Sequence, residues 1–599
     1  TTAKLTDVSV SSGGEQVLRL DFNGGDFNVN WVEFVDGESK SATLDVVGAQ
    51  QTWHKTTLVL DGPTASETDS RNPFLDYRFA VEFTGPSGQT VTVPGYFAAD
   101  GDAANTGATA GTVWEANLLA DEAGTWEYRT VFEEGTAVAV DPGTGSTTEY
   151  HDISGSFEVT ATDKAPPDMR AKGLLVNPGS HYLQFQGSGE YYLESGANSP
   201  ENFLSYEEFD QSGSTHAYSP HTDDWENGDP TWDGGRGKGI VGAVNYLVSQ
   251  GINAHYFITY TIDGGDGDDV WPWISTNDRL RFDVSKLAQW EVVLGHMTRN
   301  GIAPHLVLTE KENDDTLDDG TLGTVRKLYY REMVARFGWH PALIWCVGEE
   351  HDPTLPYEEF AAFLRGLDPY GHPVGVHNYP SETGDLWDPV MGDRNFDFGP
   401  LQHNDNAYDG STTIQQYRQQ SADAGQPWSV VMSEVGDGDT GIPCDGQEVN
   451  GVTPADCRRD ALWPNLVGGG AAGHEYYFGY QTCANDVDTE DYRTRDQWWD
   501  WAGHAHSFFV DNLPFWEMSP DNASTSAGYM LGHPDGTHYA VYLPGGSEAT
   551  VDIASGSFTL KWYDPTTGQF EAEETVEGGS DTALGSPISG DAAALLVQQ

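Results

Sequence analysis

The chain is 599 residues long and carries 93 acidic against 29 basic residues, a formal net charge of −64. That length exceeds what one hydrophobic core supports, so we expect two to four domains. Aromatic residues make up 12% of the chain, far too many for a disordered acidic chain. So negative a surface repels nucleic acid, which argues against that partner but not against a neutral glycan.

The acidic residues are spread along the whole chain, a composition expected of a protein kept soluble in concentrated salt, where charge repulsion is screened. No apolar run is long enough to span a membrane. Because the chain starts at Thr1 and holds no apolar signal segment, we expect a processed, secreted protein of a high-salt environment. The sequence indicates no oligomeric state.

Four cysteines are too few for a disulfide scaffold. Cys444 and Cys457 bracket a polar loop and are predicted to form a disulfide, with Cys483 as a third candidate in the same region. Cys346 lies inside an apolar run, which indicates a buried thiol.

Residues 1–165 alternate apolar and polar positions between Gly, Asp and Ser clusters, a pattern typical of β-sandwiches. A Pro-rich stretch at 163–169 marks a domain boundary. Strand-like and helix-like segments then alternate, which predicts a (β/α)8 TIM barrel, with a doubly wound open sheet as the alternative. Beyond the helix near Arg495, β-like alternation returns and predicts a small C-terminal sandwich. The expected barrel strands are Tyr191–Glu194, Asn253–Tyr260, Ala303–Thr309, Leu343–Val347, Pro373–His377, Phe398–His403, Ser429–Glu434 and Ala472–Phe478.

Polar residues cluster at the C-terminal ends of these predicted strands, where barrel active sites are built. A carboxylate buried there is destabilising unless something compensates it, and basic residues near these ends are scarce. The carboxylates must therefore repel one another, share protons or bind something. The residues concerned are Glu310, Glu349 and Glu350, His377 and Asn378, Gln402 and His403, Glu434, and His474, Glu475 and Tyr477, at the ends of strands three to eight in that order.

Paired carboxyls of this kind suit glycoside hydrolysis. One carboxyl keeps its proton and protonates the leaving oxygen, while its neighbour stays ionised and attacks the anomeric carbon. Strands four and seven face each other across a barrel mouth, so Glu434 could flank a sugar together with Glu350 or Glu349. A carboxylate separation of about 5–5.5 Å would mean retention of configuration.

Aromatic residues around strand two supply flat faces that stack on sugar rings. We expect the four aromatic residues Trp225, Trp271, Trp273 and Tyr260 to contact substrate. The other residues expected to do so are Asn198, Glu310, His377, Asn378, Gln402, His403 and Tyr477. The predicted hydrolysis requires no cofactor. The same loops could hold a structural Ca2+ through oxygen ligands, although their spacing departs from an EF-hand. The candidate ligands are Asp263, Asp266, Asp268 and Asp269.

Two motifs resemble clan A glycoside hydrolases. The run from Ile344 to Glu350 (IWCVGEE) is similar to their strand-four signature Trp-x-x-Gly-Asn-Glu, which implies that Glu350 is the acid/base. The run SEVG around Glu434 resembles their strand-seven Ser-Glu-x-Gly, whose Glu is the nucleophile. Glu349 falls where the family has Asn, so the resemblance leaves open whether Glu349 is itself the acid.

Longer runs resemble a little-characterised bacterial group of barrel glycosidases with an N-terminal Ig-like domain of the DUF5060 type. NPFLDYRFAVEFTGPSGQTVTVPGYF looks like that Ig-like domain, and FTLKWYDPTTGQF looks like the group's C-terminal domain. The first forty residues are similar to the last strands of a family 6 carbohydrate-binding module, and the composition resembles proteins of halophilic archaea. The expected domains are a remnant over 1–45, an Ig-like sandwich over 46–165, the barrel over 166–515 and a sandwich over 516–599.

The sequence therefore predicts a retaining glycoside hydrolase that acts on a polysaccharide or oligosaccharide. One alternative is a carbohydrate-binding surface protein whose barrel has lost catalysis, which the carboxylates of strands four and seven disfavour. Another is a polysaccharide lyase, which needs a base and a charge neutraliser, whereas Arg and Lys are scarce near the strand ends. Neither the sugar nor the linkage follows from the sequence.

Overall fold

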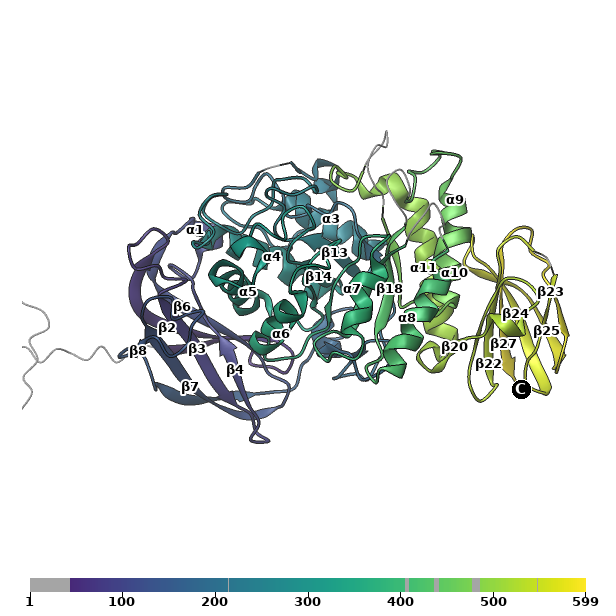
Figure 1. The fold of residues 1–599 in the computed structure, drawn as a ribbon, viewed down its shortest axis with the longest axis horizontal. Coiled ribbons are helices and arrows are strands. Elements are labelled where there is room, and N and C mark those ends of the chain that lie inside the picture. The colour runs from purple at the N-terminus through teal and green to yellow at the C-terminus, as the bar shows by residue number, and fades with distance from the viewer. Residues whose placement is uncertain (1–43, 214, 404–408, 436–440, 477–484, 547) are drawn as a thin grey trace, which may run out of the picture. The chain divides into compact units, whose positions relative to one another are not determined.

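The computed structural model describes residues 44–599, apart from 214, 404–408, 436–440, 477–484 and 547. It contains an N-terminal antiparallel sandwich, a closed parallel barrel and a C-terminal antiparallel sandwich (Figure 1), which confirms the predicted fold class. The predicted remnant over 1–45 lies almost wholly outside the described residues. Within the described part of the chain, no helix is long and apolar enough to cross a membrane.

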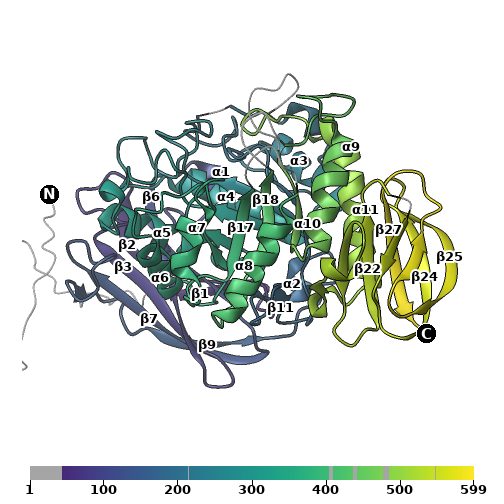
Figure 2. The same cartoon turned by 45° about the vertical axis from the view of Figure 1, so that its right-hand side comes forward.

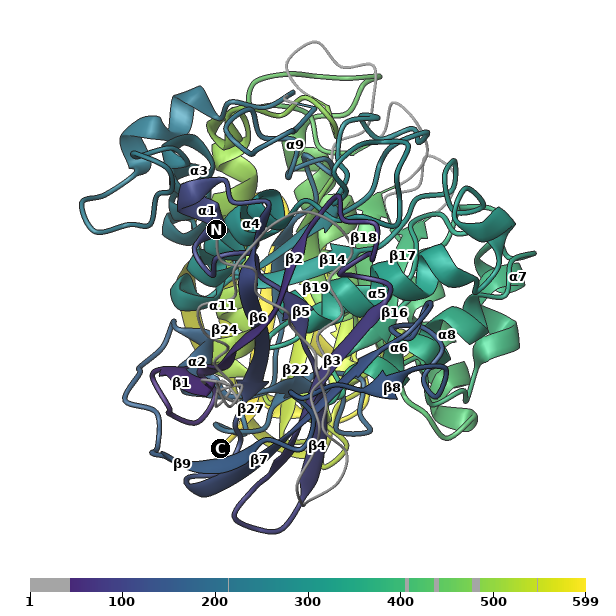
Figure 3. The same cartoon turned by 90° about the vertical axis from the view of Figure 1, so that its left-hand side faces the viewer.

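The N-terminal sandwich consists of two sheets, with strand orders β1-β2-β6-β5 and β4-β3-β7-β8, and β9 pairs with β7. Figure 3 looks onto these strands. Alternate side chains point between the sheets, and Trp114 and Phe132 meet there with ring centroids 5.0 Å apart. The strands are β1 (Leu44–Gly48), β2 (Lys55–Ser66), β3 (Tyr77–Thr84), β4 (Thr90–Pro94), β5 (Tyr96–Phe97), β6 (Ala110–Leu119), β7 (Gly124–Glu134), β8 (Ser146–Thr147) and β9 (Ser154–Val159), with helix α1 (Ala103–Thr106) between β5 and β6.

Eight parallel strands form the barrel, and β19 closes it by pairing with β12. Seven strands lie where the sequence predicts them, but the first is Glu194–Ala197 rather than Tyr191–Glu194. The reason is that Tyr192 pairs its N–H with the carbonyl of Leu183 instead of joining the barrel. The strands are β12 (Glu194–Ala197), β13 (Ala254–Ile258), β14 (Ala303–Val307), β15 (Ile344–Cys346), β16 (Val374–Gly375), β17 (Phe398–His403), β18 (Ser429–Val435) and β19 (Ala472–Glu475).

Helices alternate with these strands. Helix α4 is capped at its start by Asp283, whose carboxylate accepts the N–H of Lys286, and at its end by Gly301 in the left-handed conformation. The hairpin of β10 and β11 precedes the barrel. The elements are α2 (Met169–Lys172), β10 (Leu175–Val176), β11 (Gln184–Phe185), α3 (Lys238–Ser249), α4 (Val284–Asn300), α5 (Thr324–Phe337), α6 (Tyr357–Leu367), α7 (Thr383–Trp387), α8 (Ser411–Asp423), α9 (Pro454–Cys457), α10 (Trp463–Val467) and α11 (Asp496–Asn512).

Both sandwiches are fastened to barrel helices. In α5, Arg331 and Arg336 donate to the carbonyls of Phe79 and Phe97 in the N-terminal sandwich, at 2.6 and 3.0 Å. On the other side, Trp463 of α10 stacks on Tyr542 of β22 with ring centroids 5.3 Å apart. Figure 2 shows α10 next to the C-terminal sandwich. The C-terminal strands are β20 (Ser519–Pro520), β21 (Tyr529–Gly532), β22 (His538–Leu543), β23 (Glu548–Val551), β24 (Gly556–Asp564), β25 (Gln569–Gly578), β26 (Thr582–Gly585) and β27 (Ala592–Gln598).

The cysteines depart from the prediction. Cys444 is disulfide-bonded, whereas Cys457 is a free buried thiol, so the predicted Cys444–Cys457 bond is wrong. The physical reason is that Cys457 ends the short helix α9, where its Sγ donates to the carbonyl of Gly441 at 3.5 Å. Cys346 is a free buried thiol, as predicted. The third candidate, Cys483, lies outside the described residues.

Candidate active site

The C-terminal ends of the barrel strands bring carboxylates together, as the sequence predicts. Glu349 follows β15, and Glu434 lies near the end of β18. Each is only 2% exposed, and oxygens of both lie within 4.8 Å of each other and of a ring nitrogen of His377. Burial raises the pKa of both carboxyls, and the charge of Glu349 raises that of Glu434 further. Two carboxyls this close cannot both ionise without a compensating charge.

His377 lies beside Glu434, with Nε2 3.2 Å from its Oε1. Burial lowers the pKa of His377 to about 3, so its ring is neutral at neutral pH. Its Nδ1 accepts the N–H of Glu350 at 3.2 Å, which assigns the ring proton to Nε2, the nitrogen that faces Glu434. The Nε2–Oε1 contact lacks hydrogen-bond alignment here. His377 therefore holds a proton donor next to Glu434 without adding a charge.

Glu350 differs from Glu349 in backbone and surroundings. Its φ of 42° places it in the left-handed region, which is strained for a non-glycine residue. Its side chain is partly exposed and contacts Gln402, whereas Glu349 accepts the Tyr256 hydroxyl at 2.7 Å inside the barrel. Burial raises the pKa of Glu350 to about 8. A carboxyl with this pKa carries its proton at neutral pH.

Further carboxylates join this group. Glu201, in the segment after β12, is 2% exposed, and an oxygen of it lies within 4.8 Å of oxygens of Asp266 and Glu349. Burial raises the pKa of Glu201 well above its usual range, and it raises that of Asp266 to about 7. Asp266 also lies within 4.8 Å of Glu310 and Glu312. The mouth of the barrel is thus strongly acidic.

Glu310 is fully buried and shapes the loop after β13. Its Oε2 accepts the N–H groups of Gly265 and Asp266, at 2.9 and 2.7 Å. A side chain at Gly264 would clash with this carboxylate, because a Cβ there would lie 1.8 Å from Glu310 Oε1. Glu310 therefore positions Asp266. The remaining candidate Ca2+ ligands have protein partners instead, with Asp263 paired to Arg279, Asp268 accepting the N–H of Asp263, and Asp269 accepting the amide of Asn202.

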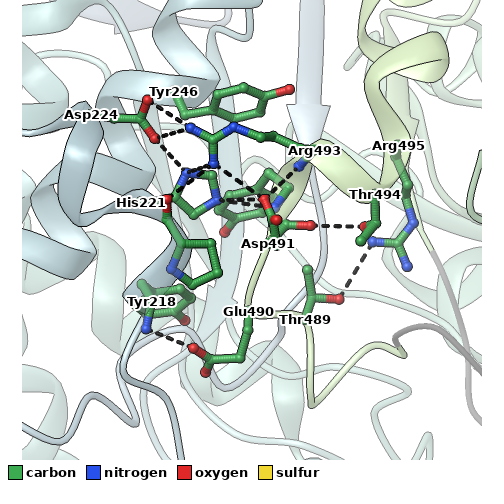
Figure 4. Close-up of polar contacts among 12 residues, drawn as sticks. Tyr218, His221, Asp224, Tyr246, Thr489, Glu490, Asp491, Arg493, Thr494 and Arg495 are labelled. Atoms are coloured by element: carbon green, nitrogen blue, oxygen red, sulfur yellow. Dashed lines mark hydrogen bonds and ion pairs between the residues drawn. The ribbon is translucent and has the colours of Figure 1, made fainter.

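The strand-eight carboxylate has a structural role. Glu475 is fully buried and pairs with Arg495 at 3.2 Å, while its Oε2 accepts the N–H of Ser199. Figure 4 shows how the segment carrying Arg495 is held, since Arg493 bonds Asp224 and contacts His221 next to it. Glu475 thus has a cationic partner, whereas Glu349 and Glu434 have none within the part of the chain that the structure describes. His474 likewise pairs with Glu194 at 2.9 Å in the barrel interior.

Other residues predicted to bind substrate form hydrogen bonds that hold the strand ends around the site. Asn198 donates its amide to the carbonyl of Ser433 at 2.7 Å, next to Glu434. The amide of Asn378 donates to the carbonyl of Gln402 at 2.9 Å and to the Thr383 hydroxyl, which ties two strand ends together. Among the described residues, the Gln402 side-chain oxygen has no hydrogen-bond partner. His403 is partly buried at the end of β17, and Tyr477 lies outside the described residues.

The predicted aromatic contacts are partly wrong. Trp273 and Tyr260 are fully buried and pack edge-on with ring centroids 4.9 Å apart, so neither offers a face to a sugar. Their apolar faces fill the space between the loop after β13 and helix α5. Trp225 and Trp271 are partly buried, and each has a lysine ammonium over its ring, Lys238 at 4.2 Å and Lys286 at 4.6 Å. Only these two have ring surface near solvent.

Sequence reasoning missed Glu201 and Tyr256. Tyr256 lies inside β13, and its inward position was the signal that could have found it, because alternate residues of a barrel strand point into the barrel. Glu201 lies four residues beyond β12. Because the sequence places the first strand three residues too early, its expected C-terminal end is Glu194, and Glu201 lies well beyond that end.

Comparisons with known proteins agree with this architecture. Residues 49–133 match the family model of a domain of unknown function, DUF5060, as the resemblance implied. No curated protein matches the chain. A candidate glycoside hydrolase from Bacteroides vulgatus has a TM-score of 0.65 at 12% identity, covering 92% of this chain and 99% of that one. A family 5 glycoside hydrolase from the same organism has a TM-score of 0.54 at 13% identity, over 73% and 96%. At such identities the likeness shows the fold alone.

Proposed function

We propose that this protein is a retaining glycoside hydrolase, with Glu434 as the nucleophile and Glu350 as the acid/base. The observation that carries the proposal is the meeting of carboxyls from strands four and seven at the C-terminal end of the barrel. The substrate class is a polysaccharide or an oligosaccharide. The glycoside hydrolases with the same fold support this function without establishing it.

Glu434 suits the nucleophile because neighbouring groups hold it in place. The neutral ring of His377 lies 3.2 Å away, and Asn198 fixes the preceding residue of β18. In the first step Glu434 acts in its ionised form, which its raised pKa makes harder to reach, and bonds to the anomeric carbon while the glycosidic oxygen leaves with the proton of Glu350. In the second step water attacks the same carbon, loses its proton to the acid/base and releases Glu434.

Glu350 suits the acid/base better than Glu349 for reasons of space. An anomeric carbon and its leaving oxygen must fit between nucleophile and acid, whose carboxyls are about 5–5.5 Å apart in retaining enzymes. Oxygens of Glu349 and Glu434 lie within 4.8 Å of each other, and Tyr256 occupies the other side of Glu349. Glu350 is the more exposed of the two and can reach a leaving group. Glu349 then stands where clan A enzymes carry Asn.

Kinetics on a panel of aryl glycosides tests these roles. We expect Glu434→Ala to lose turnover on every leaving group, with azide restoring activity and giving a glycosyl azide of inverted configuration. Glu350→Ala should keep fast glycosylation with an acidic phenol leaving group and give a glycosyl azide of retained configuration. Glu359→Gln, an exposed change on α6, is the matched control. Retained configuration from Glu349→Ala instead would move the acid to Glu349.

Two further outcomes separate the alternative classes. Release of reducing ends by wild type and none by Glu434→Ala supports hydrolysis. Products that carry a new carbon–carbon double bond, detected by their ultraviolet absorbance, would identify a lyase and contradict hydrolysis. Binding to a glycan array without any cleavage by wild type would identify a carbohydrate-binding protein instead.

A further inference from the structure

Three carboxylates at the barrel mouth have no role in the double displacement as assigned to Glu350 and Glu434. They are Glu201 after β12, Asp266 in the loop after β13 and Glu349 after β15. One oxygen from each lies within 4.8 Å of the other two. Three elements far apart in the sequence thus place three acidic groups around one point.

Nothing in the described part of the chain neutralises this group. No basic side chain there forms an ion pair with any of the three, and the nearby Lys311 pairs with Glu382 at 3.3 Å. Glu201 is 2% exposed, and its Oε1 has no hydrogen-bond partner. Glu349 Oε2 also meets no N–H donor among the described residues, while its Oε1 accepts the Tyr256 hydroxyl, and its contacts with Glu201 and Glu434 are carboxyl to carboxyl. A buried acceptor left unsatisfied costs about 1–3 kcal/mol, so two such oxygens in one cluster of carboxyls require either shared protons or a bound cation.

The donor set and its dimensions fit a metal ion. Oxygens bound to one Ca2+ lie about 2.3–2.6 Å from it, so any two of them are at most about 5 Å apart. The 4.8 Å limit met by these oxygens agrees with that bound. Ligands that are oxygen only suit a hard cation, and three carboxylates offer up to about six oxygens. We propose that Glu201, Asp266 and Glu349 bind one hard divalent cation, for which Ca2+ has the fitting radius.

Hydrogen bonds from residues outside the three carboxylates hold two of the proposed ligands in place. Glu310 accepts the N–H groups of Gly265 and Asp266, which fixes the loop that carries the Asp266 ligand. Tyr256 orients Glu349 by its hydrogen bond of 2.7 Å to Oε1, which holds this carboxylate within reach of the other two ligands. A bound cation would balance the negative charge of these three carboxylates, which must otherwise share protons. It would lie beside the catalytic carboxyls and take no part in the displacement reaction.

Terbium luminescence tests the site directly, because Tyr256 lies next to a ligand and sensitises a bound Tb3+. The protein is stripped with a chelator, and Tb3+ is titrated in concentrated KCl, which screens weak binding to the acidic surface. We expect one tight site per chain that Ca2+ displaces, and an affinity at least about tenfold weaker in Glu201→Gln and Asp266→Asn. Asp263→Asn, in the same loop but paired with Arg279, is the matched control and should bind as wild type.

Equal binding by wild type and all variants would assign the signal to surface carboxylates and overturn the proposal, as would no tight binding at all. The melting temperature gives a second measurement. Ca2+ should raise it for wild type and Asp263→Asn but not for Glu201→Gln. If Glu201→Gln does not fold, the terbium titration of Asp266→Asn, a change on the loop, decides whether the cation site exists. Hydrolysis is not measured here, so the cation site and the proposed function can fail separately.

Discussion

A partly buried carboxylate, Glu291, joins the barrel to the N-terminal sandwich. Glu291 of α4 accepts Lys55 of β2 at 2.9 Å, Trp339 at 3.0 Å and His340 at 3.2 Å. Its side chain is 21% exposed. Burial acts to raise the pKa of this carboxyl, but Lys55 and His340 outweigh burial and lower the pKa to about 2. The substitution Glu291→Gln removes the charge and keeps the shape.

A fall in pKa from 4.5 to about 2 corresponds to about 3 kcal/mol of folding free energy. Burial lowers the pKa of His340, so this ring is neutral at pH 7 and contributes a hydrogen bond rather than a charge. Allowing for that and for the partial exposure, we expect Glu291→Gln to lose about 2 kcal/mol at pH 7. Because the pKa is depressed, the stabilisation is complete above pH 4.5 and is lost as pH falls toward about 2.

Urea unfolding at one fixed salt concentration, followed by circular dichroism from pH 7 to pH 3, measures this difference. The difference in free energy of unfolding between wild type and Glu291→Gln should stay constant down to about pH 4.5 and then decrease. Glu359→Gln, exposed on α6, should show no such difference at any pH. A difference for Glu291→Gln that is independent of pH, or that widens in acid, would refute the reasoning.

Two other predictions concern buried groups. Arg495→Met should leave Glu475 without its cation inside the barrel and destabilise the fold by about 3–5 kcal/mol, measured by urea unfolding, whereas the double change with Glu475→Gln should recover most of that loss. Cys457→Ala should leave the disulfide of Cys444 intact, so that thiol titration of the denatured, unreduced variant finds one thiol fewer than wild type. A gain of one thiol would show that Cys457 is oxidised.

The barrel could be predicted because its signals are local and repeated. An apolar strand, a helical stripe such as Leu287 to Met297 and a stop at Gly301 recur along the chain, and the structure shows each of them. The sequence misplaces the first strand because the apolar run at Tyr192 looks like a barrel strand. In the structure Tyr192 pairs with Leu183, outside the barrel. That three-residue error concealed Glu201, a residue whose importance depends on where its strand ends.

Composition and spacing could not decide which aromatics are exposed or which cysteines pair. Trp271 and Trp273 are two residues apart in one loop, yet one is partly buried and the other is in the core against Tyr260. Loop sequences carry no period that separates the two cases. Cys444 and Cys457 are close in sequence, but helix α9 directs the Cys457 thiol to a backbone carbonyl. Such outcomes depend on contacts between segments distant in the chain.

The choice between Glu349 and Glu350 shows why a motif alone could not assign the acid. In a strand, neighbouring residues point to opposite faces, so only one of two adjacent glutamates would face the mouth. Strand β15 ends at Cys346, before both of them, and Glu350 adopts a φ of 42°. Because both residues follow the end of the strand, their side chains need not point to opposite faces. Glu349 lies close to Glu434 and Glu201, and Glu350 contacts Gln402. One strained residue thus lets one strand end supply two chemically different positions, an outer one proposed as the proton donor and an inner one proposed as a cation ligand.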